Sequence, residues 1–178
     1  SPYPSFRQSL FDVLSHLRHF MPITMITASK ESHGFSNSSG VKALIPQMHE
    51  ELFRRGYSVL MDVKEEKKEQ PDDSGDVNML AYYRDSWTFH CKGIWSHIDQ
   101  ETLLTYVGSS NMGERSYHRD MELGFLLVTK NAHLKHQLHK ERDRILKYCH
   151  KREALPTPQT IQSTRFIKLL TRATRSYL

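Results

Sequence analysis

The segment between residues 79 and 128 most constrains how this chain can fold, because it contains four short runs typical of β-strands. Aliphatic and aromatic residues dominate each run, and polar turns separate one run from the next. The expected strands cover residues 79–83, 88–95, 102–107 and 122–128, the last of them buried, and a polar helix follows at 131–148. Successive short strands followed by a helix favour a sheet that is covered by helices.

The rest of the chain alternates in the same way. Apolar residues at helical spacing predict a helix at 5–20, and a short buried strand follows at 23–27. Further expected elements are a loop at 30–40, a helix at 46–55, a strand at 57–63, a charged loop at 64–76 and a last helix at 161–177. We therefore expect an α/β layered domain at residues 1–155 with a mobile loop at 64–76, followed by a basic amphipathic helix at 156–178.

The positive charge of the chain is concentrated near its C-terminus. Residues 130–178 hold 12 Lys and Arg against 3 Asp and Glu, a net charge of +9, whereas residues 1–129 carry a net charge of −4. Only the C-terminal third is therefore expected to attract anions, either phospholipid headgroups or nucleic acid. The two cysteines, Cys91 and Cys149, indicate neither a disulfide framework nor a cysteine zinc site. No apolar run approaches the roughly 18 residues that a membrane span needs.

Five polar residues are expected to meet at the ends of neighbouring strands. In a strand, His90 and Lys92 project from one face while Cys91 points into packing on the other. Ser109 and Asn111 follow the next strand, and Glu122 begins a further strand.

This set suits transfer at a phosphodiester. Lys92 and Asn111, supported by Ser109, are expected to stabilise negative charge on the non-bridging phosphate oxygens. His90 can attack phosphorus or move a proton to and from the bridging oxygen, and Glu122 can orient its imidazole. The cationic side chains of this set supply the positive charge that the phosphate needs. Neither a metal ion nor another cofactor is therefore expected.

The sequences HCK at 90–92 and GSSN at 108–111, with a Glu eleven residues beyond the Asn, resemble the HxK…GSxN motif of the phospholipase D superfamily. The resemblance implies a layered α-β-α domain with a mixed central sheet, one half of an enzyme with two such motifs. One position departs from the pattern, since His97 stands where the superfamily usually has an Asp that acts mainly as a structural support.

Within the superfamily, the flanking sequences are most similar to the mitochondrial phosphatidylglycerophosphate synthases. The similar blocks are YYRDSWTFHCKGIW, RSYHRDMELG and the HGF…G…IP segment around Gly34, Phe35, Gly40 and Pro46. The resemblance implies attack on CDP-diacylglycerol, release of CMP and capture of the phosphatidyl group by glycerol 3-phosphate, at the matrix side of the mitochondrial inner membrane. Bacterial phosphatidylserine synthase, which uses the same donor with serine, is a near neighbour.

The resemblance also implies that a second HxK half completes the site. One histidine of such enzymes forms a phospho-histidine and the other acts as acid and then base. Because this chain is similar to the C-terminal motif, we expect His90 to be the acid and base, with the nucleophile in an N-terminal half or in a second copy.

Several residues near these motifs allow either a substrate-binding or a structural interpretation. Arg115 and Arg119 are candidates for binding substrate phosphates, with a salt bridge to Asp120 as the equal alternative. Tyr83 and Trp95 are candidates for contacting the substrate. Tyr82, Tyr83 and Trp87 either line an acyl or cytosine pocket or belong to the core, and the core is favoured for at least one of them.

Two further patterns favour a plain structural role. The spacing of His133, His136 and His139 permits metal binding, but a solvated helix face is favoured. The last helix has one apolar and one basic face, which suits an anionic membrane surface about as well as docking on the domain itself.

Three rival functions remain beside the leading one. They are a phosphatidylserine synthase-like transferase, a phospholipase-D-type nuclease that grips nucleic acid with its basic tail, and a non-catalytic half that binds lipid. Nucleic acid is the less expected partner, because residues 1–129 are acidic overall.

Overall fold

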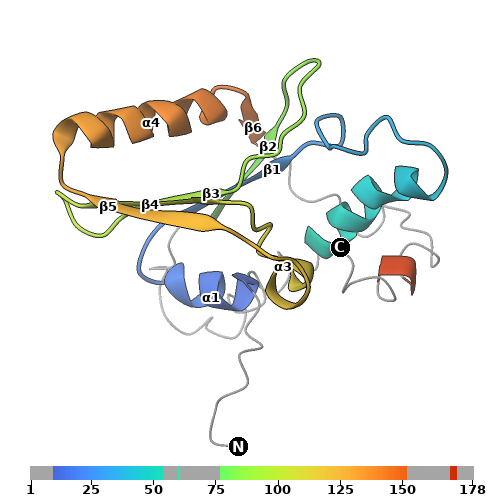
Figure 1. Cartoon of the computed structure of the whole chain (residues 1–178), viewed down its shortest axis with the longest axis horizontal. Helices are drawn as coiled ribbons and strands as arrows, with labels where there is room; N and C mark the ends of the chain where they lie inside the picture. Colours follow the sequence, from blue (N-terminus) through green and yellow to red (C-terminus); the bar gives the residue numbers. More distant parts are fainter. Residues whose placement is uncertain (1–9, 54–59, 61–76, 152–168, 172–178) are drawn as a thin grey trace, which may run out of the picture.

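A computed structural model gives the arrangement of the chain and describes residues 10–53, 60, 77–151 and 169–171 (Figure 1). The element order is α1 (Leu10–Leu17), β1 (Ile23–Ala28), a 3-10 helix (Gly40–Leu44), a helix over 45–53, β2 (Val77–Tyr82), β3 (Gly93–His97), β4 (Leu103–Gly108), α3 (Glu114–His118), β5 (Gly124–Thr129), α4 (Ala132–Leu146) and β6 (Cys149–Lys151). Figure 1 draws α4 and α1 on opposite sides of the strands. The α/β class and the layered arrangement expected from the sequence are confirmed.

The described strands form two three-stranded sheets. The first is mixed and has the order β1-β2-β6, in which β1 and β2 run parallel and β6 runs antiparallel to β2. The second has the order β3-β4-β5 and is antiparallel throughout, with Gly93 paired to Val107 and Gly108 paired to Gly124. The short strand β6 was not expected, because its sequence Cys-His-Lys carries no apolar pattern.

Helix α4 lies on one face of the antiparallel sheet and contacts it near His97. Asn131 caps its N-terminus, where the Asn131 side chain accepts a hydrogen bond from the Leu134 backbone N–H over 2.9 Å. The rings of His97 on β3 and His139 on α4 lie 5.2 Å apart, and Lys135 Nζ donates to the Glu101 carbonyl over 2.7 Å. These contacts place α4 on the face of the sheet that carries His97.

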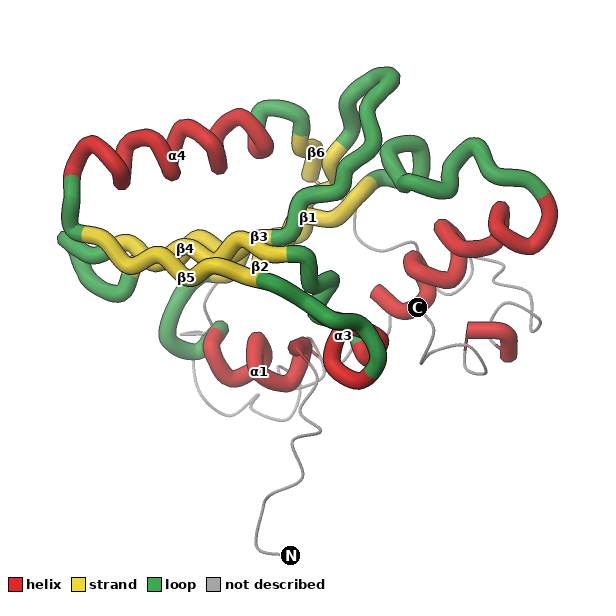
Figure 2. The backbone as a smooth tube through the Cα atoms, viewed as in Figure 1, coloured by secondary structure: helices red, strands yellow, loops and turns green. Residues whose placement is uncertain are grey.

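The expected strand at 88–95 is wrong in its first half. Residues 88–92 form a loop between β2 and β3, and the strand begins only at Gly93 (Figure 2). The chain turns at Ser86, whose φ is 60°, and the Phe89 N–H then donates to the Ser32 carbonyl over 2.9 Å. Cys91 is exposed, so its expected place in the packing is also wrong.

The expected burial of the strand at 122–128 is wrong as well. In β5, residues 124–128 are all exposed, including Phe125 at 64%, Leu126 at 63% and Val128 at 56%. β5 pairs with β4 on one side, and within the described residues no strand pairs with its other side. A continuous apolar run is typical of a strand that is covered on both faces, and β5 has this sequence without the cover.

Several other expected elements fall partly outside the described residues. α1 and β1 confirm the expected helix and strand in the parts that are described, and the helix over 45–53 confirms the one expected at 46–55. At 57–63 only Leu60 is described; it is helical and fully buried, so an extended conformation is wrong there. The loop at 64–76 and most of the last helix lie outside the described residues, although residues 169–171 are helical. Within the described ranges, no helix combines the length and the apolar character that crossing a bilayer requires.

Candidate active site at one end of the antiparallel sheet

One end of the β3-β4-β5 sheet brings together three of the predicted site residues. The Gly108 N–H donates to the Lys92 carbonyl over 3.4 Å, so Lys92 lies beside the end of β4. The Ser109 N–H donates to the Leu123 carbonyl over 2.9 Å, which places Ser109 beside the start of β5. Because β3 and β5 begin where β4 ends, Lys92, Ser109 and Glu122 lie at the same edge.

Glycine is required where β4 and β5 meet at this edge. Gly108 and Gly124 are partners in the ladder, and the ring of Tyr106 lies against both. A Cβ added at either glycine would lie 2.7 Å from Tyr106 Cζ. The ring therefore occupies the space of two missing side chains beside Ser109.

Ser109 and Glu122 are directly bonded. The Ser109 hydroxyl donates a short hydrogen bond to Glu122 Oε2, and Ser109 Oγ accepts from the Leu123 N–H over 3.0 Å. The donated proton thus points to the carboxylate, while a lone pair of the same oxygen holds the start of β5.

A second serine binds the same carboxylate. The Ser116 hydroxyl, on α3, hydrogen-bonds to Glu122, and Ser116 Oγ accepts from the Asn111 N–H over 3.2 Å. Glu122 therefore connects the turn at 109–111, the short helix α3 and the start of β5. The sequence analysis missed Ser116, although it lies in the RSYHRD block that drew attention to Arg115 and Arg119.

The electrostatics keep Glu122 ionised. Hydrogen bonds from Ser109 and Ser116, and then the positive charges of Lys92 and Arg115, hold the pKa of its carboxyl below the ordinary value of 4.5. The predicted role of Glu122, to orient the His90 ring, remains a hypothesis, because the bonds seen at its carboxylate come from the two serines.

Lys92 and His90 lie in the loop that leads into β3. Partial burial lowers the pKa of the Lys92 ammonium, and the negative charge of Glu122 acts in the opposite direction. Lys92 Nζ donates to the His90 carbonyl over 3.2 Å, while the His90 side chain is exposed. The His90 imidazole, two residues from the partly desolvated Lys92, is thus open to a phosphate that arrives from solvent.

Of the two predicted phosphate-binding arginines, Arg115 is engaged in a salt bridge. Its Nε lies 2.9 Å from Asp120 Oδ2, which matches the structural alternative, and its charge also acts on Glu122. Arg119 is exposed just beyond α3, where its N–H donates to the Arg115 carbonyl over 2.9 Å.

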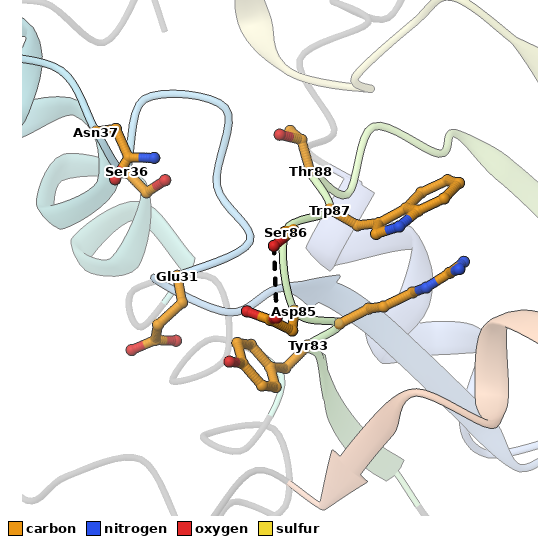
Figure 3. A pocket seen from close by; sticks show the side chains of 9 residues that line it. Glu31, Ser36, Asn37, Tyr83, Asp85, Ser86, Trp87 and Thr88 are labelled. Atoms are coloured by element: carbon orange, nitrogen blue, oxygen red, sulfur yellow. Dashed lines mark hydrogen bonds between the residues drawn. The ribbon is translucent and has the colours of Figure 1, made fainter.

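The structure does not bring Tyr83 and Trp95 to this cluster. Side chains alternate along a strand, so Trp95 shares the α4-facing side of the sheet with His97. Tyr83 lines a separate pocket, together with residues of the loops at 31–37 and 83–88 (Figure 3). Tyr82, by contrast, is buried and stacks on Phe89 with ring centroids 4.5 Å apart, which confirms the core reading for that residue.

The histidines of α4 show no sign of a metal centre. His133 and His136 are exposed, and His139 contacts His97. Among the residues that the structure describes, no group of three or more His, Cys, Asp and Glu side chains is arranged to hold a metal ion.

Comparison with known proteins finds phosphatidyltransferases among the relatives of this chain. A mitochondrial CDP-diacylglycerol–glycerol-3-phosphate 3-phosphatidyltransferase of Homo sapiens is 34% identical over 123 residues, 68% of this chain. This chain is homologous to a segment of such phosphatidyltransferases. The enzyme of the same name from Saccharomyces pastorianus is 28% identical over 163 residues, and a probable one from Dictyostelium discoideum is 28% identical over 146 residues.

The chain spans only part of these phosphatidyltransferases. The matched regions are 21% of the human protein, 23% of the Dictyostelium discoideum protein and 30% of the Saccharomyces pastorianus protein. No protein-family model matches the chain. This homology confirms the resemblance to phosphatidylglycerophosphate synthases that the sequence motifs indicate.

Proposed function

We propose that this chain supplies one half of the active site of a phosphatidyltransferase of the phospholipase D superfamily. The enzyme transfers the phosphatidyl group of CDP-diacylglycerol to glycerol 3-phosphate, giving phosphatidylglycerophosphate and CMP on the route to cardiolipin. The observation that carries the proposal is the meeting of Lys92, Ser109 and Glu122 at one end of the β3-β4-β5 sheet, next to the exposed His90. The names of the relatives supply the two substrates.

The proposed reaction has two displacements at one phosphorus. A histidine of the second half attacks the phosphatidyl phosphorus, and the bond from phosphorus to the CMP oxygen breaks as protonated His90 donates its proton to CMP. Neutral His90 then takes the proton of a glycerol 3-phosphate hydroxyl, whose oxygen attacks phosphorus and breaks the phosphorus–nitrogen bond. Lys92 and Asn111 stabilise the negative charge of the non-bridging oxygens in both steps.

The second half is expected to pack against the antiparallel sheet. The apolar residues of β5 are exposed on both faces of the strand, and the outer edge of β5 is unpaired within the described residues. Exposed apolar groups of this kind mark an interaction surface. An N-terminal HxK half or a second copy of this chain would cover it and complete the site.

The names of the relatives and the lipid substrate support the proposed location. Several relatives are named mitochondrial, and we place this chain in mitochondria, peripheral on the matrix side of the inner membrane. The basic C-terminal third would attract the anionic lipid surface, at about 1 kcal/mol for each Lys or Arg near it.

The test is an assay of the complete enzyme, with both halves present, on CDP-diacylglycerol in mixed micelles. Release of CMP and formation of phosphatidylglycerophosphate with glycerol 3-phosphate, lost in His90→Ala, would support the proposal. Product formation with serine instead would identify a phosphatidylserine synthase. Cleavage of DNA without CMP release from the lipid would identify a nuclease, and turnover that survives His90→Ala would make this half non-catalytic.

A further inference from the structure

A pocket of about 310 Å³ lies outside the Ser109–Glu122 cluster. It opens between the loop at 31–37 and the loop at 83–88 (Figure 3). Its size is at the lower end of the roughly 300–1,000 Å³ that is typical of small-molecule sites.

The two loops that form the pocket are tied together through Ser32. Ser32 is 1% exposed, its carbonyl accepts from the Phe89 N–H over 2.9 Å, and its hydroxyl accepts from the Arg84 N–H over 3.4 Å. These bonds fix the loop at 83–88 against the loop at 31–37. Hydrogen bonds between its two loops therefore shape the pocket.

The one cation of the pocket lining is held over aromatic rings. The Arg84 guanidinium lies 3.8 Å from the centroid of the Trp87 ring and 4.8 Å from that of Tyr148. In Figure 3 the Trp87 ring points away from Glu31 and Asn37. The Arg84 guanidinium, which lies over that ring, is therefore also directed away from Glu31 and Asn37.

The side chains that remain include two carboxylates, those of Glu31 and Asp85, beside hydroxyl and amide groups. Glu31, Asp85 and Tyr83 lie close together in Figure 3, and Asn37 lies on the opposite side from Thr88. Two carboxylates repel a phosphate and bind amino and hydroxyl groups. The exposed Tyr83 ring offers an apolar face beside them.

This combination matches a cytidine. Carboxylates accept a hydrogen bond from the exocyclic N4 amine of cytosine, and they bind ribose hydroxyls in nucleotide sites. An aromatic ring stacks on any base. The negative charge of the pocket would keep the phosphates of a cytidine nucleotide outside it.

The position of the pocket along the chain supports the same ligand. Thr88 lines the pocket and lies two residues before His90, so the two Cα atoms are at most about 7 Å apart. Phosphates that leave the pocket in this direction approach His90 and Lys92. We propose that this pocket binds the cytidine of CDP-diacylglycerol, an inference that rests on the proposed phosphatidyl transfer.

The experiment measures CMP and UMP binding to the complete enzyme by calorimetry, and transfer kinetics with CDP-diacylglycerol. Asp85→Asn and Glu31→Gln each alter one carboxylate, and Glu101→Gln alters an exposed carboxylate of the turn between β3 and β4 as a matched control. We expect at least one of the two pocket variants to weaken CMP binding about tenfold and to reduce the preference for CMP over UMP. The KM for the donor should rise by a similar factor with little change in kcat.

A second pair of variants tests stacking at Tyr83. Tyr83→Phe should bind CMP as the native enzyme does, whereas Tyr83→Ala should lose about tenfold in affinity. Because Tyr83 is 41% exposed, both variants should fold. Unchanged CMP binding and an unchanged donor KM in all four pocket variants, in an enzyme that still transfers phosphatidyl groups, would overturn the cytidine pocket alone. Absence of transfer in the native complete enzyme would instead overturn the proposed function.

Discussion

The Ser109 hydroxyl donates its proton to the Glu122 carboxylate and accepts the Leu123 N–H with the same oxygen. Ser116 repeats the pattern with the Asn111 N–H. Each of the two serine hydroxyls thus links a backbone N–H to the same carboxylate. The charge of Glu122 therefore fixes the turn at 109–111.

Replacing Glu122 by Gln should therefore disturb the turn at 109–111 while keeping a side chain of the same size in the site. The amide is uncharged and its nitrogen is a donor, so the two serine hydroxyls lose a charged acceptor. Hydrogen bonds to a charged acceptor are stronger than those to a neutral one, so we expect kcat to fall roughly tenfold or more. The measurement is CMP release at saturating donor.

Glu101→Gln provides the control for this substitution. Glu101 lies 3.7 Å from Lys130 in an exposed pair, which should contribute almost nothing. Equal kcat values for Glu122→Gln and the native enzyme would show that the carboxylate does not position the turn.

Lys92→Ala should lower kcat more than it raises KM. An ammonium that is partly desolvated before substrate arrives is a preorganised donor, and removing one such donor costs about 10²–10³ in kcat. Lys135→Ala, on α4, should leave transfer unchanged. The initial rates of both variants, measured over a range of CDP-diacylglycerol concentrations, decide the point, and a pure KM effect in Lys92→Ala would reduce Lys92 to a binding residue.

The stability of the fold should fall as the pH is lowered below 6.5, because of His49. The Phe35 N–H donates to His33 Nδ1, so His33 Nε2 carries a proton and donates it to His49 Nδ1 over 2.8 Å. Burial, followed by the repulsion from His33, lowers the pKa of His49 from 6.5 to about 4. The unfolded chain therefore binds more protons between these values, and folding loses about 3 kcal/mol from pH 6.5 to 4.

A matched variant isolates the contribution of His49. His49→Asn keeps an acceptor for His33 and removes the titrating ring, so its unfolding free energy should fall less over the same range. Urea unfolding at several pH values measures the difference between the two proteins. Parallel curves for the native protein and the variant would contradict the assignment.

The meeting of Ser109 and Glu122 was easier to predict than the conformation of the backbone around them. Ser109 and Glu122 were expected together because adjacent antiparallel strands bring their ends to one edge, a rule that needs only the order of the strands. The loop at 88–92 could not be predicted, because its backbone bonds to Ser32, more than 50 residues away, and β-type residues such as Phe89 favour a strand locally.

The exposure of β5 was hidden from the sequence for a related reason. A continuous apolar run such as Phe125–Val128 predicts a strand that is buried on both faces. It does not indicate which segment covers those faces. Ser116 and the His33–His49 pair were missed because each depends on a contact between separate elements. The sequence has no short-range pattern for such contacts.

Gly124→Ala should destabilise the sheet through Tyr106. The added Cβ would overlap the Tyr106 ring, which must then shift, at a cost of about 1–3 kcal/mol. Tyr106→Leu removes the ring and should relieve most of that cost in the double variant. Chemical denaturation of the two single variants and the double variant gives the coupling energy, and strictly additive effects would show that the ring does not fill the space over Gly108 and Gly124.

Leu126→Lys should prevent this chain from joining the second half of the site. Leu126 is 63% exposed in the middle of β5, and a cation there would have to be desolvated wherever another segment covers the strand. Val41→Lys introduces the same charge at a side chain that is 75% exposed in the 3-10 helix, and it should have no effect on assembly. Sedimentation of the complete assembly, together with its transfer activity, measures the outcome. Loss of both assembly and activity in Leu126→Lys alone would place the second half on β5, whereas an intact and active assembly would place it elsewhere.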